Sequence, residues 1–299
     1  MQTHEFWRRE YDEDPYLTHL SITELCFRAR YLIENLTTLE LNGKIGLRNI
    51  GKEPGLTLMR KFTHVLQEFG SRKEGFETMF MKDSSIPKAM LGQEDKLKRL
   101  HEYAIEKRPH LIKFGKRCFL SEYCFKVSLA SSFSDTSLNA AQKDDELKAI
   151  YNPRPRDFKV ATLDGKEVEG ILSAELTFQA PRDYYVFCTT LKFDVRLFGD
   201  FESDACLFIY DSQKFSDQLY EKVESKVGIL DHGYRPVVYT DPIMPEHKKI
   251  PSVEFHKHIK YLYQSEFRHV FIPIKDSENP LDLYISIPEA DEYTEIVFL

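Results

Sequence analysis

A glutamine and a glutamate two positions apart, Gln264 and Glu266, are the residues of this chain best placed to do chemistry. They stand at the start of an alternating apolar run, residues 268–274, that is typical of a core strand. Residues two apart on a strand point to the same face, so both polar groups could reach into one cleft. A carboxylate at the edge of a buried strand is costly unless it is paired with a cation or used in catalysis.

A structural explanation competes with the catalytic one. Arg268 lies two residues after Glu266 and on the same strand face, and Lys257 and Lys260 precede it in the chain. Glu266 could therefore belong to a network of salt bridges inside a core sheet. The residues themselves leave both interpretations open.

A second polar pair, Thr189 and Thr190, ends the aromatic strand candidate 184–191. Adjacent strand residues face opposite sides, so we expect that these two threonines are not both in the core. Strand propensity alone explains threonines among aromatic residues. In the functional interpretation, one hydroxyl orients a ligand and the other braces the backbone.

Two groups of residues suggest a metal ion. His256 and His258 form an H-x-H pair, but no third ligand is evident and neighbouring lysines would repel a cation, so no metal site is expected there. Asp144, Asp145 and Glu146 could serve a metal-dependent nuclease. They fall in a stretch, residues 138–150, that is predicted to be helical, and a solvated acidic turn explains them more simply.

Composition restricts the broad class of protein. The chain has 299 residues, 42% hydrophobic and 30% charged, as in soluble globular proteins. A net charge of −7 argues against a broad, sequence-independent grip on nucleic acid or anionic membrane, and the short basic run 113–117 is interpreted as a solvated turn. Five cysteines without a C-x-x-C pair argue against a disulfide scaffold and against structural zinc, and with no signal peptide or long apolar run we expect a cytoplasmic protein.

The periodicity divides the chain into a helical N-terminal region, residues 1–108, and a strand-rich domain, residues 109–299. Ser21 and Glu24 have the spacing of a capping box, so a helix is predicted to begin there and to end at Asn42-Gly43. The remaining predictions are two helices near 56–70 and 93–107, a helix at 212–227, and strands at 118–128, 158–163, 174–178, 205–210, 237–239 and 283–287. Strands that do not alternate regularly with long helices indicate an α+β fold, with a mixed, mainly antiparallel β core and short helices.

Nucleotide-binding and nucleophile motifs are missing from the sequence. No G-x-G-x-x-G follows a strand, no P-loop motif occurs, and no G-x-S-x-G marks a nucleophile elbow. The Rossmann and P-loop folds and the serine hydrolases are therefore not supported by their motifs.

Taken together, the two strand motifs resemble those of ADP-ribosyltransferases. The segment 187–191, Phe-Cys-Thr-Thr-Leu, resembles their aromatic-Ser-Thr-Ser strand, and Gln264-Ser-Glu266 looks like the Gln-x-Glu strand that carries their catalytic glutamate. The order along the chain agrees, while Cys188 replaces the first serine. The last 120 residues or so also resemble a widespread group of uncharacterised bacterial proteins, which share a Cys-[ST]-[ST] strand and a final Tyr-x-x-Glu-[FY]-Arg.

The resemblance implies roles for individual residues. NAD would be the co-substrate and no metal would be needed; Glu266 would stabilise an oxocarbenium-like state and Gln264 would orient the acceptor. Thr189, Thr190 and Tyr185 would help to hold the cofactor. The family also needs an Arg, His or Tyr on an earlier strand, for which Arg117, Arg154 and Arg156 are candidates and Arg117 is our choice.

These implications lead to one main hypothesis and two alternatives. The main hypothesis is an NAD-dependent ADP-ribosyltransferase, a bacterial toxin or phage-defence effector that modifies a protein or nucleic acid and has an inhibitory antitoxin as a further partner. The first alternative is a non-enzymatic regulatory or interaction protein with the same strands as its core. The second is the metal-dependent nuclease.

Overall fold

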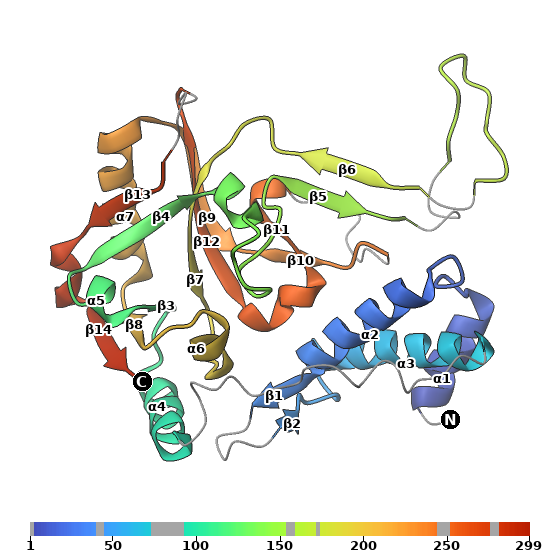
Figure 1. Ribbon diagram of the computed structural model, residues 1–299, viewed down its shortest axis with the longest axis horizontal. Helices are drawn as coiled ribbons and strands as arrows, with labels where there is room; N and C mark the ends of the chain where they lie inside the picture. The colour runs from blue at the N-terminus through green and yellow to red at the C-terminus, as the bar shows by residue number, and fades with distance from the viewer. Residues whose placement is uncertain are drawn as a thin grey trace. The chain divides into compact units, whose positions relative to one another are not determined.

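The structure is a computed structural model that describes residues 3–39, 45–72, 93–153, 159–171, 174–243, 252–275 and 281–299. Its secondary structure is α+β with a mainly antiparallel sheet, as predicted (Figure 1). The chain forms two compact units. The first comprises residues 1–85, 151–176 and 242–245, and the second comprises residues 86–150, 177–241 and 246–299.

The first unit is helical. It contains α1 (Thr3–Glu13), α2 (Ile22–Leu36), α3 (Gly55–Arg72) and a small antiparallel ribbon of β1 (Thr37–Leu39) and β2 (Ile45–Leu47). The capping box at the start of α2 is confirmed, because Ser21 and Glu24 each accept from the other's backbone N–H. The predicted end of this helix is wrong: α2 stops at Leu36, where two β-branched threonines begin the extended β1. Asn42-Gly43 lies outside the described residues.

The second unit holds the main sheet and the remaining helices. Its helices are α4 (Glu94–Lys107), α5 (Arg117–Leu120), α6 (Arg196–Asp200) and α7 (Ser212–Val227). Its strands are β3 (Leu111–Gly115), β4 (Cys124–Leu129), β5 (Lys148–Tyr151), β6 (Leu176–Gln179), β7 (Tyr185–Thr190), β8 (Ala205–Ile209), β9 (Ile229–Pro236), β10 (Val238–Thr240), β11 (His256–His258), β12 (Glu266–Pro273), β13 (Leu283–Ser286) and β14 (Thr294–Phe298). The last residue of β5, Tyr151, and the first residue of β6, Leu176, are assigned to the first unit.

β7 is the centre of the main sheet. One path of hydrogen-bonded strands runs β13-β4-β7-β3-β8-β14, and β12 joins β7 to β9. All these pairs are antiparallel. β7 is therefore paired with β12 along its length on one side, and with both β4 and β3 on the other side.

The strands β4 and β3 contact different ends of β7. β4 pairs at Val186 and Tyr185, whereas β3 pairs only at Thr190. Between these two points, no strand of the described residues pairs with β7 on that side. The sheet therefore splits around Cys188, and this split creates the space for the site described below.

Apolar side chains cover both faces of β7. On one face, α7 packs Phe215, Leu219 and Val223 against Phe187 and Phe271. On the other face, a second cluster contains Ala130, Tyr184, Val186, Phe255 and Val270. Because both faces are covered, the expectation that Thr189 and Thr190 are not both in the core is wrong: 5% and 4% of their surfaces are exposed.

Several other predicted elements differ from the structure. The predicted helix 138–150 is wrong, since this stretch consists of turns followed by β5; Asn139 accepts backbone N–H bonds that close one turn. The predicted strand 118–128 begins only at Cys124, after α5 and a left-handed Tyr123. At 158–163, Phe158 lies outside the described residues and the rest forms a turn with a single bridge between Ala161 and Glu167.

Candidate active site

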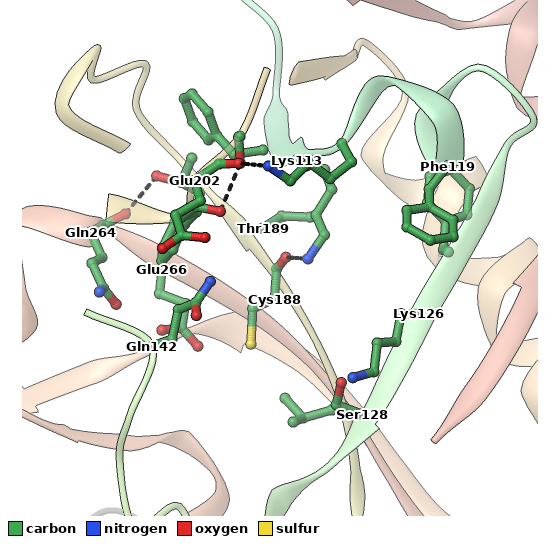
Figure 2. Close-up of a pocket in the computed structure, with 18 of the residues that line it drawn as sticks. Lys113, Phe119, Lys126, Ser128, Gln142, Cys188, Thr189, Glu202, Gln264 and Glu266 are labelled. Carbon is green, nitrogen blue, oxygen red and sulfur yellow. Dashed lines mark hydrogen bonds between the residues drawn. The ribbon is translucent and has the colours of Figure 1, made fainter. Parts of the chain in front are cut away.

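A cavity of about 470 Å³ lies at the split in the sheet. Its wall is formed by β3, β4, the second half of β7, the segment 138–142 and the residues around Gln264 and Glu266 (Figure 2). Ile112, Phe114, Leu120, Phe125 and Val186 make much of this wall apolar. Apolar walls with a few convergent polar groups are the usual construction of a small-molecule site.

Four of the six residues proposed from the sequence line this cavity. They are Gln264, Glu266, Thr189 and Thr190. Glu266 and Thr190 are direct cross-strand neighbours, because β12 and β7 pair in that register. Gln264 does not lie on the strand of Glu266, as had been expected. It ends a 3-10 helix (Ile259–Gln264), and Ser265, in the left-handed conformation, connects this helix to β12.

Hydrogen bonds hold these polar groups to the backbone. The Thr190 hydroxyl donates to the Gln264 carbonyl at 2.6 Å, and the Thr189 hydroxyl donates to the Phe267 carbonyl at 3.1 Å. The Gln264 amide donates to the Ala141 carbonyl at 2.8 Å. Both threonines therefore brace the segment that carries Glu266.

The other two proposed residues lie elsewhere. Tyr185 points into the α7 core from the opposite end of β7 and does not line the cavity. Arg117 stacks over the Phe298 ring, at 4.3 Å from its centroid, and also does not line the cavity. Arg154 and Arg156 lie outside the described residues.

Glu266 belongs to a buried network of four charged side chains. Its Oε1 accepts from Nε of Arg268, and its Oε2 accepts from Nζ of Lys257 at 2.6 Å. Glu146 contacts the same two cations, at 2.6 Å from Arg268 and 3.5 Å from Lys257. No member has more than 7% of its side chain exposed. The structural pairing of Glu266 with Arg268, one of the two sequence interpretations, is thus present.

The network sets the ionisation of Glu266. Burial opposes the charged carboxylate, but Arg268 and Lys257 outweigh it and hold the pKa of Glu266 well below its usual range. Burial likewise opposes the Lys257 cation, and Glu266 and Glu146 outweigh it and raise the pKa of Lys257. The network thus pairs two carboxylates, Glu266 and Glu146, with two cations, Arg268 and Lys257.

Lys113 is a cation that the sequence interpretation missed. The run 113–117 was expected to be a solvated turn, which is wrong for Lys113: it lies on β3 and lines the cavity. Its Nζ donates to the Cys188 carbonyl at 2.8 Å (Figure 2) and sits 4.6 Å from the Phe187 ring centroid. That carbonyl points away from β12 and toward the split, so Lys113 satisfies a strand group that has no ladder partner.

The electrostatic surroundings of Lys113 differ from those of Lys257. Within the described residues, no carboxylate lies within 4.0 Å of the Lys113 ammonium. Burial lowers its pKa, while Cys188 and Glu266 partly oppose this effect. Burial therefore disfavours the charged form of Lys113, and an anionic group in the cavity would stabilise it.

The acidic residues 144–146 have different partners in the structure. Glu146 is 4% exposed and committed to Arg268 and Lys257, so the interpretation of a solvated acidic turn is wrong for this residue. Asp145 instead pairs with Lys148 on the surface. No group of three or more His, Cys, Asp or Glu side chains suited to a metal ion occurs among the described residues.

Sequence signals for the missed residues were weak. Lys257 was visible as a cation near Glu266, but nothing in the sequence linked Glu146 to Arg268, which lies 122 positions away. The apolar residues Leu111, Ile112 and Phe114 around Lys113 could have indicated the strand β3, but they did not indicate that its lysine lines a cavity.

Comparisons with protein-family models, with curated proteins and with solved structures give no match for this chain. In the residues that the structure describes, no helix has both the length and the apolar character needed to cross a bilayer.

Proposed function

We propose that this protein is an NAD-dependent ADP-ribosyltransferase and that the cavity beside Glu266 binds NAD. One observation carries the proposal: residues of the two motifs, at 189–190 and at 264–266, line a single cavity. A cation on the earlier strand β3, Lys113, also lines the cavity and would take the place of the cofactor-holding residue that the family resemblance implies. Lysine differs from the Arg, His or Tyr of that resemblance.

The lining suits the parts of a dinucleotide. Four lysines and two glutamates line the cavity, although the whole chain has a net charge of −7. Lys126 is paired with Asp282 at 2.8 Å, whereas the partners of Lys113 among the described residues are a carbonyl and a ring. Lys113 would thus hold a phosphate, and the apolar side chains would pack against the rings.

NAD supplies a glycosidic bond whose cleavage leaves the bonding electrons on nicotinamide and a positive charge on the ribose. Glu266 would stabilise that positive charge, which is the electrostatic contribution that usually matters most in such reactions. Each Glu266 oxygen has one charged donor and keeps acceptor capacity for a second. Arg268 and Lys257 are shared with Glu146, so Glu266 is not their sole carboxylate partner.

The experiment compares two glutamates of the same network. Glu266 lines the cavity and Glu146 does not, although both contact Arg268 and Lys257. The protein is incubated with NAD labelled in its adenylate part and with a lysate containing protein, DNA and RNA. Wild type and Glu146→Gln should transfer label, and folded Glu266→Gln should lose activity by a factor on the order of 10²–10³. Absence of transfer by wild type, or equal transfer by Glu266→Gln, would overturn the proposal.

The proposed biological setting follows from the same hypothesis. A transferase that modifies a macromolecule in the cytoplasm would act as a toxin or phage-defence effector, held in check by an inhibitory partner. Expression of wild type should then stop bacterial growth, and expression of Glu266→Gln should not. Growth that is unaffected by the wild-type protein would contradict this setting.

One observation favours a second candidate, a non-enzymatic regulatory or interaction protein. Both oxygens of Glu266 are engaged by buried cations, as expected of a purely structural residue. In that case the cavity would bind a small anionic ligand as a signal, without turnover. Calorimetry that shows NAD binding but no nicotinamide release, in wild type and in Glu266→Gln alike, would support this candidate.

A further inference from the structure

β9 has a long open edge. One side of this strand pairs with β12 over most of its length, and among the described residues no strand pairs with its other side. Most of its residues are exposed, including Leu230 at 63%. Open edges of this length are templates for pairing with another strand.

Successive residues of β9 direct their main-chain N–H and C=O groups alternately toward β12 and toward the open edge. The Val237 N–H donates to the Glu266 carbonyl at 3.0 Å, and antiparallel pairing alternates from there. The main-chain groups of Asp231, Gly233 and Arg235 therefore face β12. Those of His232 and Tyr234 face outward, and among the described residues the outward His232 N–H donates to the side chain of Asp231, at 2.8 Å.

We propose that β9 pairs antiparallel with β9 of a second copy, around a two-fold axis at Gly233. In this register His232 lies opposite the partner's Tyr234, so both outward residues exchange their main-chain hydrogen bonds. Asp231 then lies opposite the partner's Arg235, and Arg235 opposite the partner's Asp231. The strand is thus complementary in charge to itself, as an isologous interface requires.

The positions of the charged residues favour this register over the two registers shifted by two residues. The same hydrogen-bond phase also permits registers shifted by two residues, which place either Asp231 or Arg235 opposite the partner's Gly233. Those registers lose both cross-strand ion pairs. In the proposed register, Asp231 and Arg235 occupy the positions without main-chain hydrogen bonds, where facing side chains come closest.

Contacts within the protomer prepare the strand for pairing. Arg235 lies over the Phe255 ring, at 4.1 Å from its centroid, and one of its nitrogens donates to the Ser252 hydroxyl at 2.9 Å. A guanidinium has five donors, so others stay available to a carboxylate. Gly233 lies at the two-fold axis, and a Cβ there would contact the Phe255 ring of its own chain at 3.4 Å. Pro236 lies in the outward phase, where its missing N–H breaks no bond to β12.

Sedimentation equilibrium of the full chain tests the proposal. Wild type should show a mass that rises with concentration from one chain toward two. Asp231→Arg and Arg235→Asp each place like charges opposite one another twice, and each should weaken dimerisation on the order of tenfold or more. Mixed in equal amounts, the two variants should form a heterodimer, because each then meets opposite charge.

A control and a backbone variant separate this surface from general charge effects. Glu221→Arg makes the same change of charge on the exposed surface of α7 and should dimerise like wild type. His232→Pro removes one outward N–H and should produce a monomer. Wild type that stays monomeric at every concentration would overturn the proposal, as would a mixture of the two charge variants that forms no dimer. The test uses no NAD, so its outcome is independent of the proposed activity.

Discussion

At the scale of the residue, the stability of this protein depends on the balance of two carboxylates and two cations. Removing one charge leaves a buried cation without compensation, which costs more than the intact pair contributes. We predict that Glu266→Gln and Glu146→Gln each lower the free energy of unfolding by about 3 kcal/mol. Urea denaturation measures this loss. The exposed pair Lys214–Glu292 is the control, and Glu292→Gln should leave the midpoint unchanged.

Asp144, next to this network, gives a prediction about pH. Burial, with help from Glu146, raises the pKa of Asp144 from 3.8 to about 6, so the folded state binds its proton more tightly than the unfolded state. Stability is therefore lost as pH rises from about 4 to above 6. Asp144→Asn should be more stable than wild type at pH 8 and equal to it below pH 4. A constant difference in unfolding free energy across this range would contradict the assignment.

At the scale of the element, α2 shows how a local signal defines a helix terminus. The Ser21 hydroxyl accepts from the Glu24 N–H, and the Glu24 carboxylate accepts from the Ser21 N–H at 2.7 Å. Ser21→Ala should destabilise the protein by about 1 kcal/mol, and Ser21→Asp should restore most of this loss. Thermal unfolding distinguishes the two variants. Equal melting temperatures for both would show that the cap contributes little.

The split between β3 and β4 is the element-scale feature that creates the site. Because these strands contact different ends of β7, the Cys188 carbonyl is left for Lys113 and the cavity opens beside it. No periodicity within a single strand indicates such a divergence. It results from how two strands far apart in sequence share one neighbour.

At the scale of the whole molecule, the boundary of the second unit has a measurable consequence. α4 belongs to this unit, where Tyr103 donates to Glu295 at 2.6 Å and Leu97 and Leu100 are buried. A fragment that begins at residue 93 should therefore unfold at a higher temperature than one that begins at residue 109. Circular dichroism melts of the two fragments measure the difference. Equal melting temperatures would mean that α4 adds no stability to the sheet.

Local signals in the sequence were enough to predict much of the secondary structure and part of the site. The capping box, α7 and the strands β7, β8 and β12 follow from capping, periodicity and strand propensity, which act between near neighbours. The short distance from Gln264 to Glu266 likewise predicted that both would reach one cleft. Among the strands that were not predicted, β9, β11 and β14 show no clear alternation of apolar and polar residues in their sequences.

Only the tertiary structure decided what surrounds Glu266. Glu146, Lys113 and Lys257 come from three separate segments, and long-range packing brings Glu146 and Lys257 against its strand and Lys113 to the same cavity. The burial of Thr189 and Thr190 was equally invisible, since covering both faces of a strand depends on elements elsewhere in the chain. The sequence by itself determined which residue types could do chemistry, and the packing of distant segments determined their charge, their burial and their cavity.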